Sequence, residues 1–386
     1  MVIIQAVLNA LATAFDMFWE VLWPLALGFI LSAIVQTLVS RRAVERALGS
    51  DSARSLGLAT LFGAASSSCS YAAVAIARSL FRKGASFPAA IVFEFASTNL
   101  VFELGLVLLI LLGWSFVGAE FAGGLLMIVI LALLFRWTLK PEMIEEARQQ
   151  VEQGRRGRME GHGEMDMSIT DGPFLKRLFS GRGLTSISHN FWMDVTSVWT
   201  DIGLGLLIAG ALAAWVPAAF WQSFFLTGHP VLSQIWGPLI GPVISLLSFV
   251  CSIGNVPLAA VLWNGGISFG GVIAFLFADL IVIPILDIYR KYYGGRMALY
   301  LLGVSYLAMA LAGFAIGLLF QGLGFVPAHH QVTALFSPPA LNYTSVLNVI
   351  SLVVMGVLGW RFLRTGGVEM LQMMEMPSQG HAAHPH

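Results

Sequence analysis

The chain has 386 residues, of which 57% are apolar and only 11% are charged, with 21 basic and 21 acidic side chains. About a quarter of the residues of an ordinary soluble protein are charged, so this composition excludes that class and predicts a polytopic membrane protein. The net charge of zero gives no indication of nucleic-acid binding, and we expect no cofactor.

Seven apolar runs are long enough to cross the hydrocarbon core of a bilayer, which takes about 20 residues. The first has no basic segment before it and no cleavage site, so we interpret it as a retained span and not as a signal peptide. In chain order the runs are Phe15 to Val39, Phe87 to Leu112, Phe121 to Trp137, Phe191 to Val216, Phe269 to Leu286, Met297 to Phe320 and Ser345 to Leu363.

Two further apolar stretches, Leu58 to Leu80 and Val231 to Leu262, are interrupted at their centres by small and polar residues. They contain the start of an internal duplication: Cys69 to Leu100 aligns with Cys251 to Val282 without a gap, and 12 of the 32 aligned positions are identical. The two cysteines that open the copies are the only ones in the chain. This pattern indicates two equivalent half-sites in one molecule and is typical of a transporter.

The charge pattern favours re-entrant hairpins over full spans at the two interrupted stretches. Lys and Arg concentrate in short cytoplasmic loops, and basic residues flank the first stretch on both sides: Arg41, Arg42, Arg46 and Arg54 before it, Arg78, Arg82 and Lys83 after it. The region around the second stretch, Trp215 to Ser268, has no Lys or Arg, so both of its ends should face outside. The alternative, nine full spans with small residues packing the helices, would export the basic residues that follow the first stretch.

We therefore predict an all-α polytopic membrane protein with two inverted repeats, each with a broken or re-entrant helical hairpin, plus one extra C-terminal transmembrane helix. The expected parts are a first repeat over 1–138, a charged cytoplasmic linker over 139–186 and a second repeat over 187–320. An external loop with the final span over 321–364 and a cytoplasmic tail over 365–386 complete the chain. With the N-terminus outside, all 21 Lys and Arg residues face the cytoplasm.

The linker and the tail contain methionine and histidine, in the segment Met159 to Met167 and in the tail from Met370 to His386. Thioether and imidazole groups are ligands for soft cations such as Cu(I). The alternative is that both segments are ordinary polar chain.

The interruptions carry the candidate substrate-binding residues. A thiolate is a strong ligand for thiophilic centres, whereas a buried thiol in apolar surroundings is inert. Both cysteines lie at a predicted helix break, so we assign them as soft metal or metalloid ligands, with a simple packing role as the alternative and a disulfide disfavoured. The candidate substrate-binding residues are Cys69, Cys251, Ser68, Ser70, Ser252, Asn255, Thr98 and Asn99.

Two acidic residues follow the interruptions at equivalent depth. Asp279 aligns with Ser97, one helical turn from Glu94, and neither acid has a Lys or Arg at its depth. An ionised, unpaired carboxylate inside hydrocarbon is costly. We therefore predict that Glu94 and Asp279 couple protons or face a cation, with structural hydrogen bonding as the alternative. Glu20 and Asp201 form a weaker second pair, and Glu103 is left without a role.

The motif residues resemble the bacterial predicted-permease family that includes the organoarsenical efflux permeases. The resemblance extends from about Phe18 to Tyr293 and rests on two motifs: Cys69-Ser70 with Leu80 and Lys83-Gly84-Ala85-Ser86, and Phe249-Val250-Cys251-Ser252 with Pro257-Leu258-Ala259-Ala260. It implies an inner-membrane efflux permease with the motif cysteines as arsenic ligands. The family's first motif commonly has a second Cys, a Gly and a Pro, where this chain has Tyr71, Ala72 and Ala75.

The favoured function is therefore proton-coupled efflux of a thiophilic metal or metalloid species, a trivalent organoarsenical first among them, across the bacterial inner membrane. The alternatives are a transporter of another solute, such as Cu(I) or a small organic anion, and a channel on the same scaffold. An intramembrane enzyme is not expected, because the apolar runs contain no HExxH motif or dense acid and histidine cluster. The partners are the solute, the lipid bilayer and protons, and the sequence leaves a homo-oligomer open.

Overall fold

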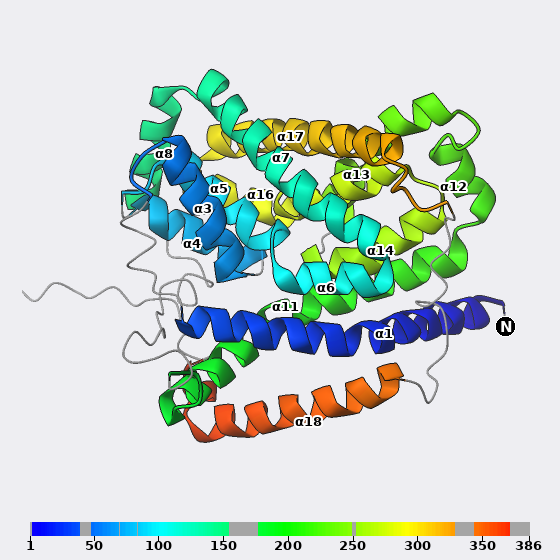
Figure 1. Ribbon diagram of the computed structural model, residues 1–386, viewed down its shortest axis with the longest axis horizontal. Helices are drawn as coiled ribbons and strands as arrows, with labels where there is room; N and C mark the ends of the chain where they lie inside the picture. Colours follow the sequence, from blue (N-terminus) through cyan, green and yellow to red (C-terminus); the bar gives the residue numbers. More distant parts are fainter. Residues whose placement is uncertain are drawn as a thin grey trace, which may run out of the picture.

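The computed structural model describes residues 2–38, 48–68, 70–82, 84–153, 177–248, 252–328 and 343–370. These residues form α-helices and one 3-10 helix, with no strand among them, which confirms the predicted all-α class. In Figure 1 the long helices α1, α17 and α18 run roughly along the horizontal direction of the view, and α7 crosses it at a slant. Both cysteines, the Met159 to Met167 segment, the tail after Met370 and the side chains of Glu20 and Asp201 lie outside the described part.

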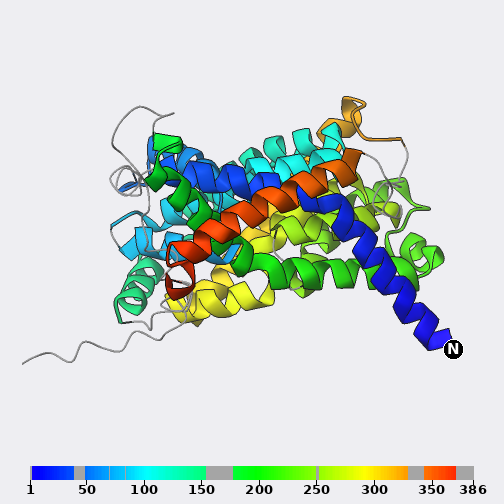
Figure 2. The ribbon, with the colours of Figure 1, turned by 90° about the horizontal axis from the view of Figure 1, so that it is seen from below.

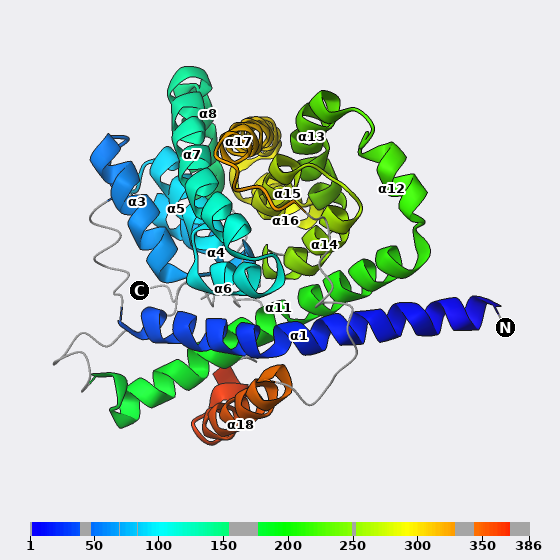
Figure 3. The same cartoon turned by 45° about the vertical axis from the view of Figure 1, so that its right-hand side comes forward.

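The helices fall into two groups of the same order, which lie side by side in Figure 3. The first group comprises α1 (Val2–Leu38), α3 (Ala53–Ser66), α4 (Ser70–Arg82), α5 (Phe87–Asn99), α6 (Phe102–Leu111) and α7 (Trp114–Thr138), followed by α8 (Pro141–Gln153). The second group comprises α11 (Gly181–Trp215), α12 (Ala218–Phe224), α13 (Pro230–Ser248), α14 (Ser252–Asn264), α15 (Phe269–Leu276), η1 (Phe277–Leu280), α16 (Ile283–Tyr293) and α17 (Gly295–Gly322), followed by α18 (Tyr343–Arg364).

The duplicated segment has the same local structure in both copies. Helices α4 and α14 are each 13 residues long and begin at the equivalent serines. Gly84 and Gly266 both adopt a positive φ, +103° and +94°, a conformation that glycine tolerates at no steric cost. Ser86 and Ser268 then cap the next helix, each accepting a hydrogen bond from the backbone N–H three residues later. The sequence repeat is therefore also a structural one.

Equivalent long helices lie next to each other and run in opposite directions. In the pair α1 and α11, the Trp215 indole donates to the carbonyl of Ala6 at one end, and the hydroxyls of Thr37 and Ser186 are 3.0 Å apart at the other. In the pair α7 and α17, the end of α7 meets the start of α17 through the hydroxyls of Thr138 and Tyr300, 2.8 Å apart. Figure 1 shows the same opposed directions.

Each interrupted segment turns back toward the level at which it began. The chain before α3 lies beside the chain after α4, because the N–H of Ser86 donates to the carbonyl of Leu48 (3.0 Å) and its hydroxyl donates to the carbonyl of Ser50 (3.2 Å). In the second group, Gly266 after α14 packs against Thr227, which precedes α13, so closely that a Cβ there would come within 2.6 Å of the Thr227 methyl. Both segments have the geometry of a hairpin.

Two spans that the sequence analysis drew as continuous are broken. The run 87–112 divides into α5 and α6 after Asn99, where three consecutive side chains hydrogen-bond to carbonyls of their own helix and compete with its continuation. The run 269–286 bends by 42° between η1 and α16, where Pro284 stands in the first turn of the new helix. Hydrophobicity alone did not reveal either break.

Five of the described helices are long and apolar enough to cross a membrane, or up to seven if each of two bent pairs is one span. The five are α5 with α6 (Phe87–Leu111), α7, α13, α17 and α18. Helix α18 is the most exposed of them and packs on the outside of the bundle against α1, as Figure 2 shows. There, Asn348 of α18 donates to the carbonyl of Trp19 (2.7 Å).

Candidate functional site

The centre of the candidate site is the Asp279 carboxylate, where the two copies of the duplication meet. Its Oδ2 accepts hydrogen bonds from the hydroxyls of Ser70 (2.7 Å) and Ser252 (2.5 Å), and these two hydroxyls are 3.5 Å apart. All three side chains are buried. Ser70 and Ser252 are the first residues of α4 and α14, so two helix N-termini, with their unpaired N–H groups and positive dipole ends, converge on one negative group.

The breaks bring these N-termini to the middle of the bundle. Helix α3 ends at Ser66, and the next residue, Ser67, adopts a left-handed conformation (φ 41°, ψ 82°). The N–H of Ser68 then donates to the carbonyl of Ser97 on α5 (3.0 Å). This bond attaches the interrupted backbone to the next helix. It gives the Ser68 N–H a hydrogen-bond partner that the hydrocarbon of a bilayer could not provide. Ser68 thus anchors the first break.

Asn255 has the corresponding anchoring role in the second group. Its amide nitrogen donates to the Ser245 hydroxyl (3.1 Å), and its amide oxygen accepts from the Ser248 hydroxyl (3.2 Å). Both partners lie at the end of α13, whereas Asn255 lies in α14. The side chain therefore joins the two helices across the interruption.

Thr98 and Asn99 lie at the end of α5, and only Asn99 faces the centre. The Asn99 side chain interacts with the Asp279 carboxyl, while its oxygen has no hydrogen-bond partner among the described residues. The Thr98 hydroxyl donates to the carbonyl of Phe95 and accepts from the Asn99 amide. Thr98 therefore supports Asn99.

Glu94 does not hydrogen-bond to Asp279 but lies close enough to interact with it electrostatically. The hydroxyl of Tyr289 on α16 donates to Glu94 Oε1, and Oε2 has no partner within the described chain. Both side chains are completely buried or nearly so. The sequence analysis did not find Tyr289, because the contact joins residues 195 positions apart.

A third buried carboxyl, Glu120 on α7, also belongs to this centre. It is 0% exposed, neither of its oxygens has a hydrogen-bond partner in the described part, and it interacts electrostatically with Asp279. No described lysine or arginine forms an ion pair with Glu94, Glu120 or Asp279. The sequence analysis missed Glu120 because the predicted span began at the next residue, Phe121. An acidic residue at the start of so apolar a helix could have identified it.

Glu103, which the sequence left without a role, accepts a hydrogen bond from Ser67 at the first break. It also interacts electrostatically with Asp194 of α11. Helix α1 passes very close to it, since a Cβ at Gly28 would lie 2.2 Å from Glu103 Cβ. The first break is thus held by a second carboxyl, separate from the Asp279 centre.

Within the described residues, no group of three or more His, Cys, Asp or Glu side chains is placed to hold a metal ion. The predicted thiol ligands Cys69 and Cys251 lie outside these residues. Each of them directly precedes one of the two serines that bind Asp279. The Asp279 centre therefore contains the residue that directly follows the cysteine in each of the two predicted half-sites.

Comparison with known proteins identifies the family. Residues 6–318 match the model of a family described as "Predicted permease". A protein of Mycobacterium tuberculosis, "Putative permease Rv2963", is 56% identical over 338 residues, which cover 87% of this chain and 83% of that protein. The "UPF0718 protein YraQ" of Escherichia coli K12 is 26% identical over 327 residues, 82% of this chain and 83% of that protein. No solved structure gives a significant match.

These similarities cover nearly the whole helical bundle, including both interrupted segments and the three buried carboxyls. A permease moves a solute across the bilayer and carries out no covalent chemistry, which agrees with several apolar spanning helices around a buried polar centre. The chain therefore belongs to the predicted-permease family, as a multi-pass membrane transporter of the bacterial inner membrane and not an enzyme.

Proposed function

We propose that this permease extrudes a thiophilic metal or metalloid species, with a trivalent organoarsenical as the favoured substrate, in exchange for protons. The observation that carries the proposal is the convergence of Ser70 and Ser252 on Asp279. This contact brings equivalent residues of the two halves together deep in the protein. A solute that is bound by both halves requires such an arrangement.

The chemistry of the substrate follows from the residues that precede these serines. Thiolates are soft ligands that bind thiophilic centres strongly. A trivalent monoalkyl arsenical has two exchangeable hydroxyl groups, which Cys69 and Cys251 replace together in the proposed bound state. Each thiol gives its proton to the hydroxyl that it displaces, so two As–S bonds form and two water molecules leave. Two sulfurs hold the solute less firmly than three would, and this favours its release.

The opposed directions of equivalent helices support an alternating-access mechanism. In such transporters, inverted repeats exchange conformations around a fixed central site. The pairs α1 with α11 and α7 with α17 are related in this sense, and the two hairpins open toward opposite ends of the bundle in Figure 1. In the proposed cycle the hairpins open the thiol site first to the cytoplasm and then to the outside.

Glu94 and Asp279 are the proposed proton carriers. Both are fully buried and face no described basic partner, so either group is neutral or is balanced by a bound cation when the site is closed. The titratable groups around them are Glu120 of α7 and the tyrosines Tyr289 and Tyr293 of α16. Binding of the arsenical at the thiols would then be linked to release of protons from these carboxyls.

A small organic anion is a less suitable substrate for this centre. The two helix N-termini that would attract it already face the Asp279 side chain, so an organic anion would have to displace this carboxyl group from them. A Cu(I)-type ion is the second candidate substrate. It is supported only by the Met- and His-containing segments, which lie outside the described residues.

The test is transport of phenylarsine oxide by the purified protein in proteoliposomes, with an internal pH-sensitive dye. Cys69→Ser and Cys251→Ser, separately and together, should each abolish saturable arsenical flux and the proton flux that accompanies it. Ser351→Ala in α18, away from the centre, is the control. Unchanged flux in the double variant would remove the thiols from the mechanism, and flux that does not saturate would indicate a channel.

A further inference from the structure

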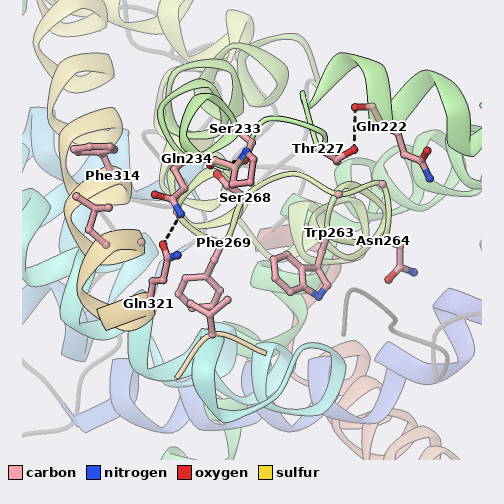
Figure 4. Close-up of a pocket in the computed structure, with 17 residues that line it drawn as sticks. Gln222, Thr227, Ser233, Gln234, Trp263, Asn264, Ser268, Phe269, Phe314 and Gln321 are labelled. Atoms are coloured by element: carbon pink, nitrogen blue, oxygen red, sulfur yellow. Dashed lines mark hydrogen bonds between the residues drawn. The ribbon is translucent and has the colours of Figure 1, made fainter. Parts of the chain in front are cut away.

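A second polar site, distinct from the Asp279 centre, is a cavity of about 470 Å³ at the far end of α14. Its wall comes from α12, α13, α17 and the turn between α14 and α15, as Figure 4 shows. Helix α14 begins at Ser252 beside Asp279 and ends at Asn264 in the cavity. Its 13 residues separate the two sites by about 18 Å at the rise of an α-helix.

The cavity is polar but uncharged. None of the described residues that line it is acidic, basic or histidine. The polar groups are side-chain amides and hydroxyls from several elements: Gln222, Thr227, Ser233, Gln234, Asn264, Ser268 and Gln321. A charged solute entering here would lose hydration without gaining an ionic partner, whereas a neutral solute with hydroxyl groups would find both donors and acceptors.

Two largely buried aromatic side chains, Trp263 and Phe269, form one side of the cavity. Trp263, 2% exposed, contacts the Phe116 ring edge-on with ring centroids 5.1 Å apart. Phe269 lies against Phe116 as well and stacks on Phe320 at 5.5 Å. In Figure 4 the Trp263 and Phe269 side chains lie beside each other at the same side of the cavity. Such a surface is suited to a flat apolar part of a ligand.

A hydrogen-bonded pair of amides spans the rim. The Gln234 amide of α13 donates to the Gln321 oxygen of α17, and Figure 4 shows this bond next to Phe269. Both side chains are at least partly exposed, so solute hydroxyls can replace their mutual hydrogen bond. The pair thus joins the second hairpin to the neighbouring long helix at the mouth of the site.

The equivalent point of the first half is covered. Phe81 corresponds to Trp263 in the duplication, and the guanidinium of Arg148 on α8 lies 4.6 Å above the Phe81 ring. Helix α8 is held there by hydrogen bonds and an ion pair, including Arg296 to Glu146 at 3.0 Å. The cavity is therefore a feature of the second half, at the end that the charge pattern predicts to face outside.

We propose that this cavity is an outer binding site of the permease for an uncharged solute that combines hydroxyl groups with a flat apolar part. The inference rests on the proposed function, because the hydrated form of a trivalent arylarsenical, an aryl group on As(OH)2, has this chemistry. The solute released by the thiols would pause here, held by amides and aromatic rings and no longer by sulfur.

Phenylboronic acid tests this site separately from the thiols. It is neutral near pH 7 and carries two hydroxyls on a phenyl ring, but it has no affinity for sulfur; benzoate is of similar size and carries a charge. Binding is titrated by ligand-detected NMR with the full-length Cys69→Ser, Cys251→Ser double variant in nanodiscs. We expect saturable binding that Gln321→Leu and Gln234→Leu each weaken about tenfold, equivalent to about 1.4 kcal/mol. Gln149→Leu on the exposed face of α8 is the matched control and should change nothing.

The outcomes separate this proposal from the previous one. Saturable phenylboronic acid binding that depends on Gln321 and Gln234 supports the outer site even if arsenical flux proves independent of the cysteines, in which case only the thiol mechanism fails. Binding that is absent, that does not respond to either glutamine substitution in variants with unchanged melting temperature, or that benzoate displaces equally well overturns the outer site.

Discussion

The hydroxyls of Ser70 and Ser252 lie 3.5 Å apart and donate to the same oxygen of Asp279. These serines are equivalent positions of a duplication, so the contact lies where the two halves of the molecule are related to each other. The acid that they share has no equivalent: the first copy has Ser97 at that position. The centre thus consists of two equivalent serines and one acidic side chain that has no equivalent in the first copy.

Loss of either serine hydroxyl should destabilise the protein. Ser70→Ala and Ser252→Ala each remove a hydrogen bond to a buried carboxyl, which costs about 1–3 kcal/mol. Because both bonds end on one oxygen, each donor partly compensates for loss of the other, and the double variant should lose more than the sum of the single losses. Unfolding by denaturant in detergent measures this cycle. Ser351→Ala in α18, away from this centre, should stay within about 0.5 kcal/mol; strict additivity would refute the shared acceptor.

The duplication relates residues of this centre that are distant in the sequence, although it did not predict their contact. The repeat placed Ser70 and Ser252 at equivalent breaks and showed that Asp279 corresponds to a residue one turn from Glu94. A residue pattern that occurs in both copies of a duplication thus indicates which distant residues occupy equivalent places in the fold.

Residues without an equivalent could not be found in that way. Tyr289, which donates to Glu94, lies on α16. The hydrophobicity of the sequence did not show that α16 is a separate helix from η1 before it. Asn255 looked like a ligand because it is polar and lies next to a cysteine motif, but its amide joins α13 to α14. Only the packing of one helix on another decides whether a polar side chain faces the centre or a neighbouring backbone.

Tyr289 and Tyr293 offer a matched comparison on one helix. Both are buried, but the Tyr289 hydroxyl donates to Glu94, whereas the Tyr293 hydroxyl has no hydrogen-bond partner among the described residues. Tyr289→Phe should lower the free energy of unfolding by about 1–3 kcal/mol because it leaves a buried carboxyl without its donor. Tyr293→Phe should leave stability unchanged or raise it. Equal losses in the two variants would mean that ring packing and not the hydrogen bond matters.

Replacing Glu120 should change the stability of the protein and its transport activity in opposite directions. Its carboxyl is buried without a partner in the described part, and removing such a group stabilises by about 1–3 kcal/mol. Glu120→Leu should therefore raise the melting temperature while it reduces proton-coupled transport, as is common for residues kept for function. Glu142→Leu, on the exposed side of α8, is the control and should affect neither quantity. A less stable Glu120→Leu protein with normal transport would assign Glu120 a structural role.

His189, which precedes the predicted span 191–216, should make the folded protein sensitive to acid. Burial, and to a smaller extent the nearby Arg361, lower the pKa of His189, whose ring nitrogen lies 2.6 Å from the Thr365 hydroxyl. A lowered pKa means that the unfolded chain binds the proton more readily, so stability is lost as the pH falls below about 6.5. Between pH 7.5 and pH 5.5 the melting temperature of His189→Gln should decrease less than that of the wild type. Parallel curves would exclude this histidine as a cause.

Two glycines in long helices should respond to alanine in opposite ways. A Cβ at Gly28 would lie 2.2 Å from Glu103 Cβ and 3.1 Å from its Cα, so α1 and α6 would have to move apart. Gly28→Ala should therefore cost about 1–3 kcal/mol, the usual effect of overpacking. It should also weaken transport, because the displaced Glu103 holds Ser67 at the first break. At Gly303 in α17, no atom lies within 4 Å of the added Cβ, and Gly303→Ala should stabilise by up to about 1 kcal/mol through helix propensity. Unfolding and flux measured on both variants test the close approach, and a stable, fully active Gly28→Ala protein would contradict it.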